Sequence, residues 1–282
     1  MLELDFSENT APRYEGFVYG LDDEIYRRQE GISQSDIKRL ISDPFKFFNG
    51  IKDEPTPSMI EGTLLHLILS EPQKLNDKFF ITNAERITSA IKEEAGERLI
   101  YKQKDLQILQ DCAGYVKNFL IQTLGIDIEK MDGEVSYFGE YEGIKAKGRA
   151  DKITHDRRAI IDFKKCANAS QKEFTRQATN LKYGIQDVFY RELMGVEEFL
   201  WVAIETKPLK DRMGKHHFMM GVYKSSELML EQGKKLIDLG LGILKNSKNF
   251  DIPIYPSENI QNDLDFGKSI IKEITPPLWA MI

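Results

Sequence analysis

The chain has 282 residues, of which 41% are apolar and 30% are charged, as in an ordinary globular protein. A chain of this length can bury a core that needs no disulfide or structural metal. Its two cysteines, Cys112 and Cys166, are too few for an iron–sulfur cluster or an all-cysteine zinc site, and so sparse a usage suits a reducing compartment. No apolar run approaches the roughly 20 residues of a membrane span, and the acidic residues 1–10 lack a signal-peptide pattern. We therefore expect a cytoplasmic protein with no membrane partner.

Charge is distributed unevenly along the chain. The whole sequence carries 39 Lys plus Arg against 45 Asp plus Glu, a net charge of -6. Residues 143–165 nevertheless contain eight basic and three acidic side chains, and residues 207–217 contain four basic side chains, one acidic side chain and two histidines. Each run can be an ordinary solvated face, which composition alone favours, or a surface that binds nucleic-acid phosphates.

The N-terminal half is expected to be mainly helical. Residues 1–30 show no clear period and are expected to form an irregular N-terminal arm. From residue 31 onward, apolar residues recur every three or four positions over 33–42, 59–70 and about 102–124, which predicts three helices. The helical part should therefore extend over residues 31–125.

Beyond Gly133 the period of the apolar residues changes from 3.6 to 2, which is typical of strands. Three short runs, at 133–143, 143–154 and 158–165, are expected to pair as antiparallel strands. Helical periodicity returns over 171–195, strands are expected at 198–206 and 217–224, and a last helix is expected at about 226–244. This order favours one α/β domain over residues 31–282, with a sheet core at 133–225 and a C-terminal helix and tail at 226–282.

Polar residues within the three predicted strands suggest a reactive centre. The strand period places Asp162 and Lys164 on one face, about 7 Å apart. A turn would bring Asp151 beside Asp162, and Glu134 begins the strand before that. Three carboxylates and one ammonium group would then converge, which calls for one or two divalent cations such as Mg²⁺ or Mn²⁺. Such a centre can hydrolyse phosphodiesters, whereas the competing interpretation is an exposed hairpin with salt bridges.

The same residues carry a family resemblance. Glu134, Gly-Arg-Ala-Asp at 148–151, Ile-Ile-Asp-Phe-Lys-Lys at 160–165 and Gln-x-x-x-Tyr at 186–190 resemble the PD-(D/E)XK nuclease superfamily, with alanine in place of the motif's proline. Within it, the chain is most similar to the RecE-like exonucleases (exodeoxyribonuclease VIII), and more distantly to phage lambda exonuclease and RecB-type nuclease domains. Three N-terminal motifs agree with this resemblance: Gly-Ile-Ser-Gln-Ser-Asp at 31–36, Pro-x-x-Phe at 44–47 and Gly-x-x-x-His at 62–66.

The resemblance covers roughly residues 31–225 and implies a restriction-endonuclease-like core, in which helices flank a central mixed sheet. It also implies that Asp151 and Asp162 bind the metal, that the carbonyl of Phe163 is a further ligand, and that Lys164 is the catalytic lysine.

The resemblance gives roles to residues outside the central motif. His66 would approach the metal, although a lone histidine on an apolar helix face is more often a core residue. Glu134 would complete the metal site or bind a second ion. Gln186 and Tyr190 lie one helical turn apart and would support the catalytic lysine and the scissile phosphate.

A further set of residues is predicted to contact DNA. Ser33 and Ser35, with Lys38 or Arg39, belong to the start of the first predicted helix, where amides and hydroxyls can bind a phosphate; helix capping explains the serines equally well. The basic residues of the two charged runs would contact the backbone, and the loop 207–217 would reach over the substrate. The full set is Ser33, Ser35, Lys38, Arg39, Lys147, Arg149, Lys165, Lys210, Arg212 and Lys215.

The resemblance implies a Mg²⁺-dependent 5′-to-3′ exonuclease that degrades one strand of linear double-stranded DNA and leaves 3′ overhangs for recombination by strand annealing. It further implies a ring-shaped homo-oligomer, a single-strand annealing protein as partner, and a phage or prophage gene in a bacterial host. Alternatives within the superfamily are an endonuclease and a RecB-like or CRISPR-associated nuclease. The alternative of another class is a catalytically inactive DNA-binding scaffold.

Overall fold

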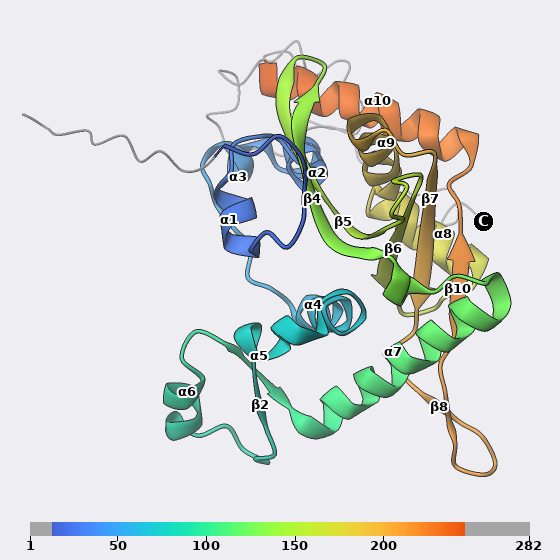
Figure 1. The fold of residues 1–282 in the computed structure, drawn as a ribbon. Coiled ribbons are helices and arrows are strands. Elements are labelled where there is room, and N and C mark those ends of the chain that lie inside the picture. The colour runs from blue at the N-terminus through green and yellow to red at the C-terminus, as the bar shows by residue number, and fades with distance from the viewer. Residues whose placement is uncertain (1–12, 246–282) are drawn as a thin grey trace, which may run out of the picture.

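The computed structural model describes residues 13–245, and its centre is a six-stranded mixed sheet (Figure 1). Neighbouring strands are antiparallel except β6 and β7, which are parallel. The predicted α/β fold with a central mixed sheet is thus confirmed. The strand order is β1 (Gly16–Val18), β4 (Asp132–Tyr141), β5 (Ile144–Ile153), β6 (Ala159–Lys165), β7 (Glu198–Ile204) and β10 (Met220–Tyr223).

Helices cover both faces of the sheet, and each face has its own apolar core (Figure 1). In β6, Ile160 belongs to the first core, whereas Ile161 and Phe163 belong to the second, as the alternation of a strand requires. The first core is formed with α2 (Gln34–Ser42), α8 (Gln171–Asn180), α9 (Tyr183–Met194) and α10 (Glu227–Lys245). The second is formed with α4 (Pro57–Ser70) and α7 (Gln103–Leu124).

The long periodic elements lie where the sequence predicts them, and the shorter elements carried no sequence signal. The segment 207–217, expected as a loop, contains a short antiparallel hairpin. The short elements are α1 (Asp23–Arg28), α3 (Pro44–Phe48), a 3₁₀ turn (Pro72–Lys74), α5 (Leu75–Lys78), β2 (Phe79–Thr82), α6 (Ser89–Ala95), β3 (Leu99–Lys102), a second 3₁₀ turn (Ile128–Lys130), β8 (Leu209–Lys210) and β9 (His216–His217).

The described part of the N-terminal arm is more ordered than the sequence suggests. β1 pairs antiparallel with β4 at the edge of the sheet, and α1 follows it. A three-residue strand and a six-residue helix are too short to show a period, which explains why neither was predicted. Residues 1–12 and most of the predicted C-terminal tail, 246–282, lie outside the described residues.

Within residues 13–245, no helix combines the length and the apolar character needed to cross a lipid bilayer.

Candidate active site

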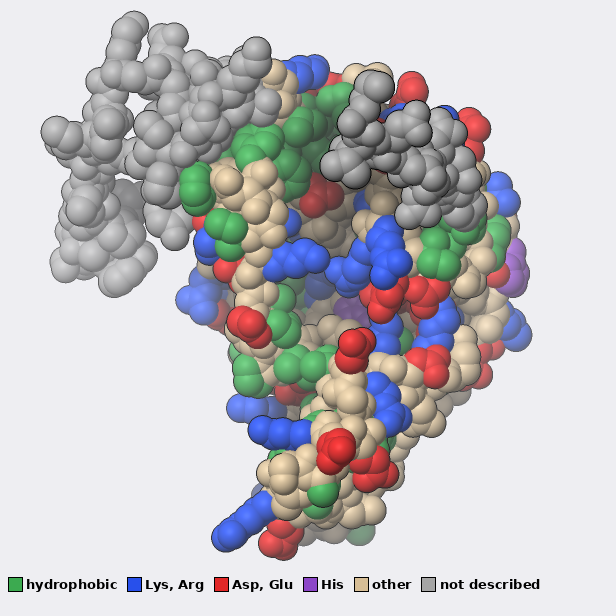
Figure 2. Space-filling model, turned by 90° about the vertical axis from the view of Figure 1, so that its left-hand side faces the viewer, with side chains coloured by type: hydrophobic (Ala, Val, Ile, Leu, Met, Phe, Trp, Pro, Cys, Tyr) green, Lys and Arg blue, Asp and Glu red, His purple; other side chains and the backbone are tan. Residues whose placement is uncertain are grey.

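The candidate site lies where β5 and β6 separate. The two strands pair only through Lys152 with Ile161 and Ile153 with Ile160. Asp151 and Asp162, the next residues on the two strands, line an open cavity of about 1440 Å³. Figure 2 shows the molecular surface hollowed near its centre, with Lys and Arg side chains gathered around the hollow. The split in the sheet therefore directs the carboxylates of both strands into one space.

Asp151 is the centre of a cluster that combines three elements. The amide of Phe163 donates a hydrogen bond of 2.9 Å to Asp151 Oδ2, which takes the place of a ladder bond between β5 and β6. His66, from α4, lies with Nδ1 at 2.9 Å from the same oxygen. Glu134, near the start of β4, completes the group, and one ligand atom from each of His66, Glu134 and Asp151 lies within 4.8 Å of the other two. Two carboxylates and an imidazole at this range form a donor set that can hold a divalent cation.

The backbone of Glu134 is unusual for a strand residue. Its φ is 48°, a left-handed value that is uncommon outside glycine and often found at functional sites. The β4–β5 ladder runs through the pairs Gly133 with Lys152 and Val135 with Ala150, and it is interrupted between them, where Glu134 faces Asp151. The interruption lets the Glu134 side chain line the cavity.

Electrostatics at the cluster favour a bound cation. Burial, followed by the nearby charge of Asp151, raises the pKa of Glu134 to about 7 and that of Asp162 to about 6. Burial acts in the same direction on Asp151, but His66 and the Phe163 amide outweigh it and lower the pKa of that carboxyl. Two of the three carboxyl groups are therefore harder to ionise than ordinary carboxyl groups, and a divalent cation would relieve this cost.

Asp162 lies deeper than the cluster, with only 1% of its surface exposed. Its Oδ1 accepts a 2.5 Å hydrogen bond from Nε2 of Gln186, on α9, and its Oδ2 forms an ion pair with Lys164. The ammonium of Lys164 also lies 5.4 Å from the ring centroids of Tyr183 and Trp201. Although burial lowers the pKa of Lys164, the two neighbouring aspartates outweigh burial and raise it, so the side chain is a fixed cation.

Sequence reasoning missed the two aromatic residues around Lys164. Tyr183 lies three positions before Gln186 on α9, and this spacing on one helix face was a usable signal once Gln186 had been selected. Trp201 is on β7 opposite Asp162 in the parallel register, which the sequence alone cannot show.

Tyr190 has a different contact from the one expected. Its hydroxyl donates a 2.9 Å hydrogen bond to the carbonyl of Arg149 and accepts one of 3.3 Å from the amide of the same residue. It therefore holds the backbone of β5 two residues before Asp151, and these bonds do not involve Lys164. Tyr190 acts on the site by fixing the strand that carries Asp151.

We expect Tyr190→Phe to lower the free energy of unfolding by about 1–3 kcal/mol, because a buried carbonyl loses its partner. Chemical denaturation measured by circular dichroism would show this loss. The cleavage rate at a temperature where both proteins are folded should change less than tenfold. A loss of activity as large as that of a metal-ligand variant, at unchanged stability, would show that the hydroxyl has a direct catalytic role.

Two basic residues of the predicted DNA-binding set have partners within the protein: Lys147 is buried and Arg149 is half-buried. The Lys147 ammonium donates to the carbonyls of Tyr26 and Arg27, at 3.2 and 3.1 Å, and to that of Gln29, at the end of α1. It is only 7% exposed, so it cannot reach a phosphate. The prediction that Lys147 contacts DNA is wrong because its ammonium instead stabilises the C-terminus of α1, where backbone carbonyls lack partners within the helix.

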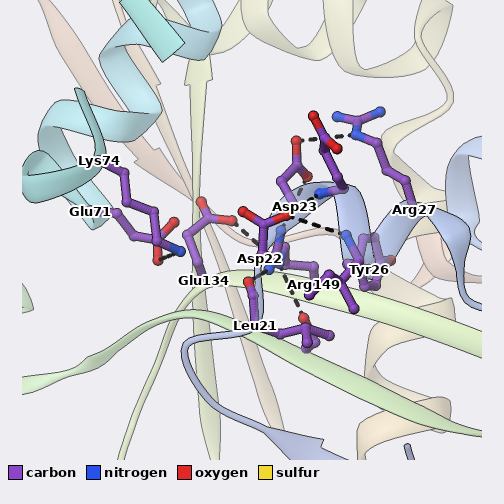
Figure 3. A network of polar contacts seen from close by, with 12 residues as sticks. Leu21, Asp22, Asp23, Tyr26, Arg27, Glu71, Lys74, Glu134 and Arg149 are labelled. Atoms are coloured by element: carbon purple, nitrogen blue, oxygen red, sulfur yellow. Dashed lines mark hydrogen bonds and ion pairs between the residues drawn. The ribbon is translucent and has the colours of Figure 1, made fainter. Parts of the chain in front are cut away.

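Arg149 is similarly occupied. Its guanidinium donates to Asp23 Oδ1 at 3.1 Å, to the Leu21 carbonyl and to Ser136 Oγ at 3.1 Å, and it lies 3.8 Å from Glu134 (Figure 3). Arg149 lines the cavity, but its donors already have protein partners. Arg149 therefore joins α1 to Glu134, and its contact with DNA stays a prediction.

The predicted residues of α2 divide into two groups. Ser33 caps the helix in a capping box with Asp36, and its hydroxyl lies 2.8 Å from that of Ser35; both serines also line the cavity. Arg39 donates to the carbonyl of residue 51 at 2.7 Å and does not line the cavity.

Lys38, on the same helix, lies 5.4 Å from the ring centroid of Tyr183, which it shares with Lys164. Burial and the nearby charge of Lys164 lower the pKa of Lys38 to about 7. Lys38 is therefore a neighbour of Lys164, the candidate catalytic lysine.

Of the remaining basic residues, one lines the cavity and three lie on the hairpin. Lys165 donates to Ser58 Oγ at 3.0 Å and pairs with Glu61 at 3.1 Å, at the cavity wall. The hairpin formed by β8 and β9 carries three exposed cations that do not line the cavity. These are Lys210, Arg212 and Lys215.

Comparisons with known proteins agree with this geometry. Residues 33–205 match the model of a family described as a PDDEXK-like domain of unknown function (DUF3799). The chain belongs to this family. The match includes His66, Glu134, Asp151, Asp162 and Lys164, so the residues that converge in the cavity all lie within the family's own span. The PDDEXK resemblance seen in the sequence is thus confirmed.

One solved structure shows the same fold. A structure described as a "Putative exonuclease" from Eubacterium rectale superposes with a TM-score of 0.56 at 16% identity, covering 90% of this chain and 96% of that one. A phage-related exonuclease from Haemophilus somnus 129PT gives a TM-score of 0.36 at 12% identity, covering 79% of this chain and 96% of that one. No curated protein matches the chain.

Proposed function

We propose that the protein is a Mg²⁺- or Mn²⁺-dependent deoxyribonuclease that acts as an exonuclease on linear double-stranded DNA. The observation that carries the proposal is the convergence of His66, Glu134, Asp151, Asp162 and Lys164 on one open cavity. An isolated hairpin with salt bridges would not bring a histidine from α4 into contact with Asp151. The membership of a PDDEXK-like family supports the same chemistry.

His66, Glu134 and Asp151 would hold the first ion, with the Phe163 carbonyl as a further ligand. Asp162 would contribute a further carboxylate. The bound cation would supply charge stabilisation to the phosphoryl oxygens and activate a water. Because one donor is an imidazole, and Mg²⁺ prefers oxygen ligands, we expect Mn²⁺ to support the reaction alongside Mg²⁺.

Lys164 would contribute the fixed positive charge. Its ammonium is anchored by Asp162 and two aromatic rings, so it does not have to reorganise as negative charge develops on the phosphate. Gln186 holds Asp162 in place and thereby positions Lys164. Lys165, on the cavity wall, would attract the DNA backbone.

The finer assignments rest on the family resemblance. They are digestion in the 5′-to-3′ direction, release of 3′ overhangs for recombination, a ring-shaped homo-oligomer, a single-strand annealing partner, and action in the cytoplasm of a bacterial cell. The exonuclease description of the structure from Eubacterium rectale supports the choice of exonuclease over endonuclease.

The test is cleavage of end-labelled linear duplex and of closed circular DNA by the purified protein, with Mg²⁺, with Mn²⁺ and with a chelator. We expect digestion of the linear substrate alone, abolished by the chelator and by Asp162→Ala. Labelling the 5′ or the 3′ end separately reports the direction. Cutting of the circle would instead identify an endonuclease, and binding without cleavage would identify a scaffold.

A further inference from the structure

Gly62, in the middle of α4, has no structural reason to be glycine within the described residues. Its φ is not positive, and a Cβ built there would have no heavy atom within 4 Å. By contrast, a Cβ on Gly233 would lie 2.4 Å from the carbonyl oxygen of Gly184, so the close approach of α9 and α10 requires glycine there. Glycine inside a helix weakens it relative to alanine. Packing within the described residues therefore does not account for the glycine at this position.

The position of Gly62 supplies such an explanation. Met59, Gly62 and His66 all line the cavity, and residues three, four and seven apart share one face of a helix. Met59 is 58% exposed although it is large and apolar. The strip from Met59 to His66 spans about 10.5 Å along the helix axis. It thus connects the exposed side of the cavity to the His66, Glu134 and Asp151 cluster.

The start of α4 is held firmly against the ends of two strands. Lys165, the last residue of β6, donates to Ser58 Oγ and pairs with Glu61. The hydroxyl of Thr206, just beyond β7, donates to the other oxygen of Glu61. The strip is therefore a fixed surface at the wall of the cavity.

We propose that one DNA strand lies along the strip formed by Met59, Gly62 and His66, with its sugar–phosphate backbone against Gly62 and a base against Met59. The missing side chain at Gly62 lets the backbone approach the helix closely. This inference rests on the proposed nuclease function and adds the path of the strand to it.

Gly114, on α7, is a matched control. It is an exposed helical glycine, a Cβ there would also have nothing within 4 Å, and it does not line the cavity. Gly62→Ala and Gly114→Ala should each raise the melting temperature by roughly 2 °C, because alanine favours the helix. Gly62→Leu and Gly114→Leu add a larger side chain that is also a good helix former.

We expect Gly62→Leu to lower kcat/KM on linear duplex by about 10- to 100-fold, and Gly62→Ala to lower it less, in the order of side-chain size. Neither Gly114 variant should change kcat/KM by more than about twofold. Met59→Ala should also lower kcat/KM, whereas Leu228→Ala, at a 75% exposed apolar position on α10, should not.

The outcomes separate this inference from the proposed function. If the wild type digests DNA and Gly62→Leu digests it equally well, the strand path is wrong and the nuclease function stands. If the wild type does not digest DNA, the nuclease proposal fails, and the path is judged by the binding of a labelled single-stranded oligonucleotide in Ca²⁺. Weaker binding by Gly62→Leu than by Gly114→Leu supports the path; equal binding, or none by the wild type, overturns it.

Discussion

Asp151→Asn is expected to lower the metal-dependent cleavage rate at least about a thousandfold while leaving the fold intact. The asparagine side chain has the same shape, so its oxygen can still accept the hydrogen bond from the Phe163 amide. It carries no charge, however, and Asp151 is the residue that His66 and Glu134 surround. Losing the central ligand removes several kcal/mol of transition-state stabilisation, and each 1.36 kcal/mol is a factor of ten in rate.

Initial rates on end-labelled duplex would measure this effect, and titration calorimetry with Mn²⁺ would show whether ion binding is lost with it. Asp156→Asn is a suitable control, because Asp156 lies exposed in the turn before β6, where its carboxylate accepts from Thr154 and Arg158. It should cleave at the wild-type rate. An Asp151→Asn protein that binds Mn²⁺ and cleaves normally would remove Asp151 from the metal site.

The part of the site that sequence could predict is the part built from neighbouring strands. Asp151 and Asp162 are eleven residues apart, and two antiparallel strands joined by a short turn must bring them together. Lys164 follows because the period of a strand is fixed at two. The long helices were equally accessible, since their apolar residues repeat over three or more turns.

Periodicity cannot predict contacts between segments that are far apart in the sequence. His66 lies 85 positions before Asp151, and only the family resemblance connected the two. Lys147 and Arg149 were misjudged in another way. A count of charges treated both as cations available to DNA, although both have partners within the protein. Their partners on and beside α1 lie more than 100 positions earlier, in a segment too short to be predicted. Charge in a sequence therefore gives an upper limit on the charge available to a ligand.

The stability of the metal-free protein is expected to fall between about pH 5 and pH 8. Burial raises the pKa of Glu134 to about 7 and that of Asp162 to about 6, against ordinary values of 4.5 and 3.8. Asp151 raises the pKa of His66 and outweighs burial, which lowers it. The folded state thus holds these protons more tightly than the unfolded state does. The stabilisation that these protons give the folded state is complete at a pH below the pKa values of the unfolded chain. It is lost as the pH rises through the pKa values of the folded state, at up to about 1.4 kcal/mol per pH unit for each proton.

Asp151, whose pKa is lowered, has the opposite sign: its contribution is lost only as the pH falls below about 4, outside this window. A divalent cation competes with the protons for the same oxygens, so it should stabilise the fold little at pH 5 and strongly at pH 8. Melting temperatures measured at each pH with a chelator and with Mn²⁺ would show the stabilisation by the cation increase as the pH rises. In the presence of the chelator, Glu134→Gln, which cannot ionise at this position, should lose less stability than the wild type as the pH rises. A difference that stays constant from pH 5 to pH 8 would mean that the ion binds elsewhere, because only groups that lose protons on binding can make its affinity depend on pH.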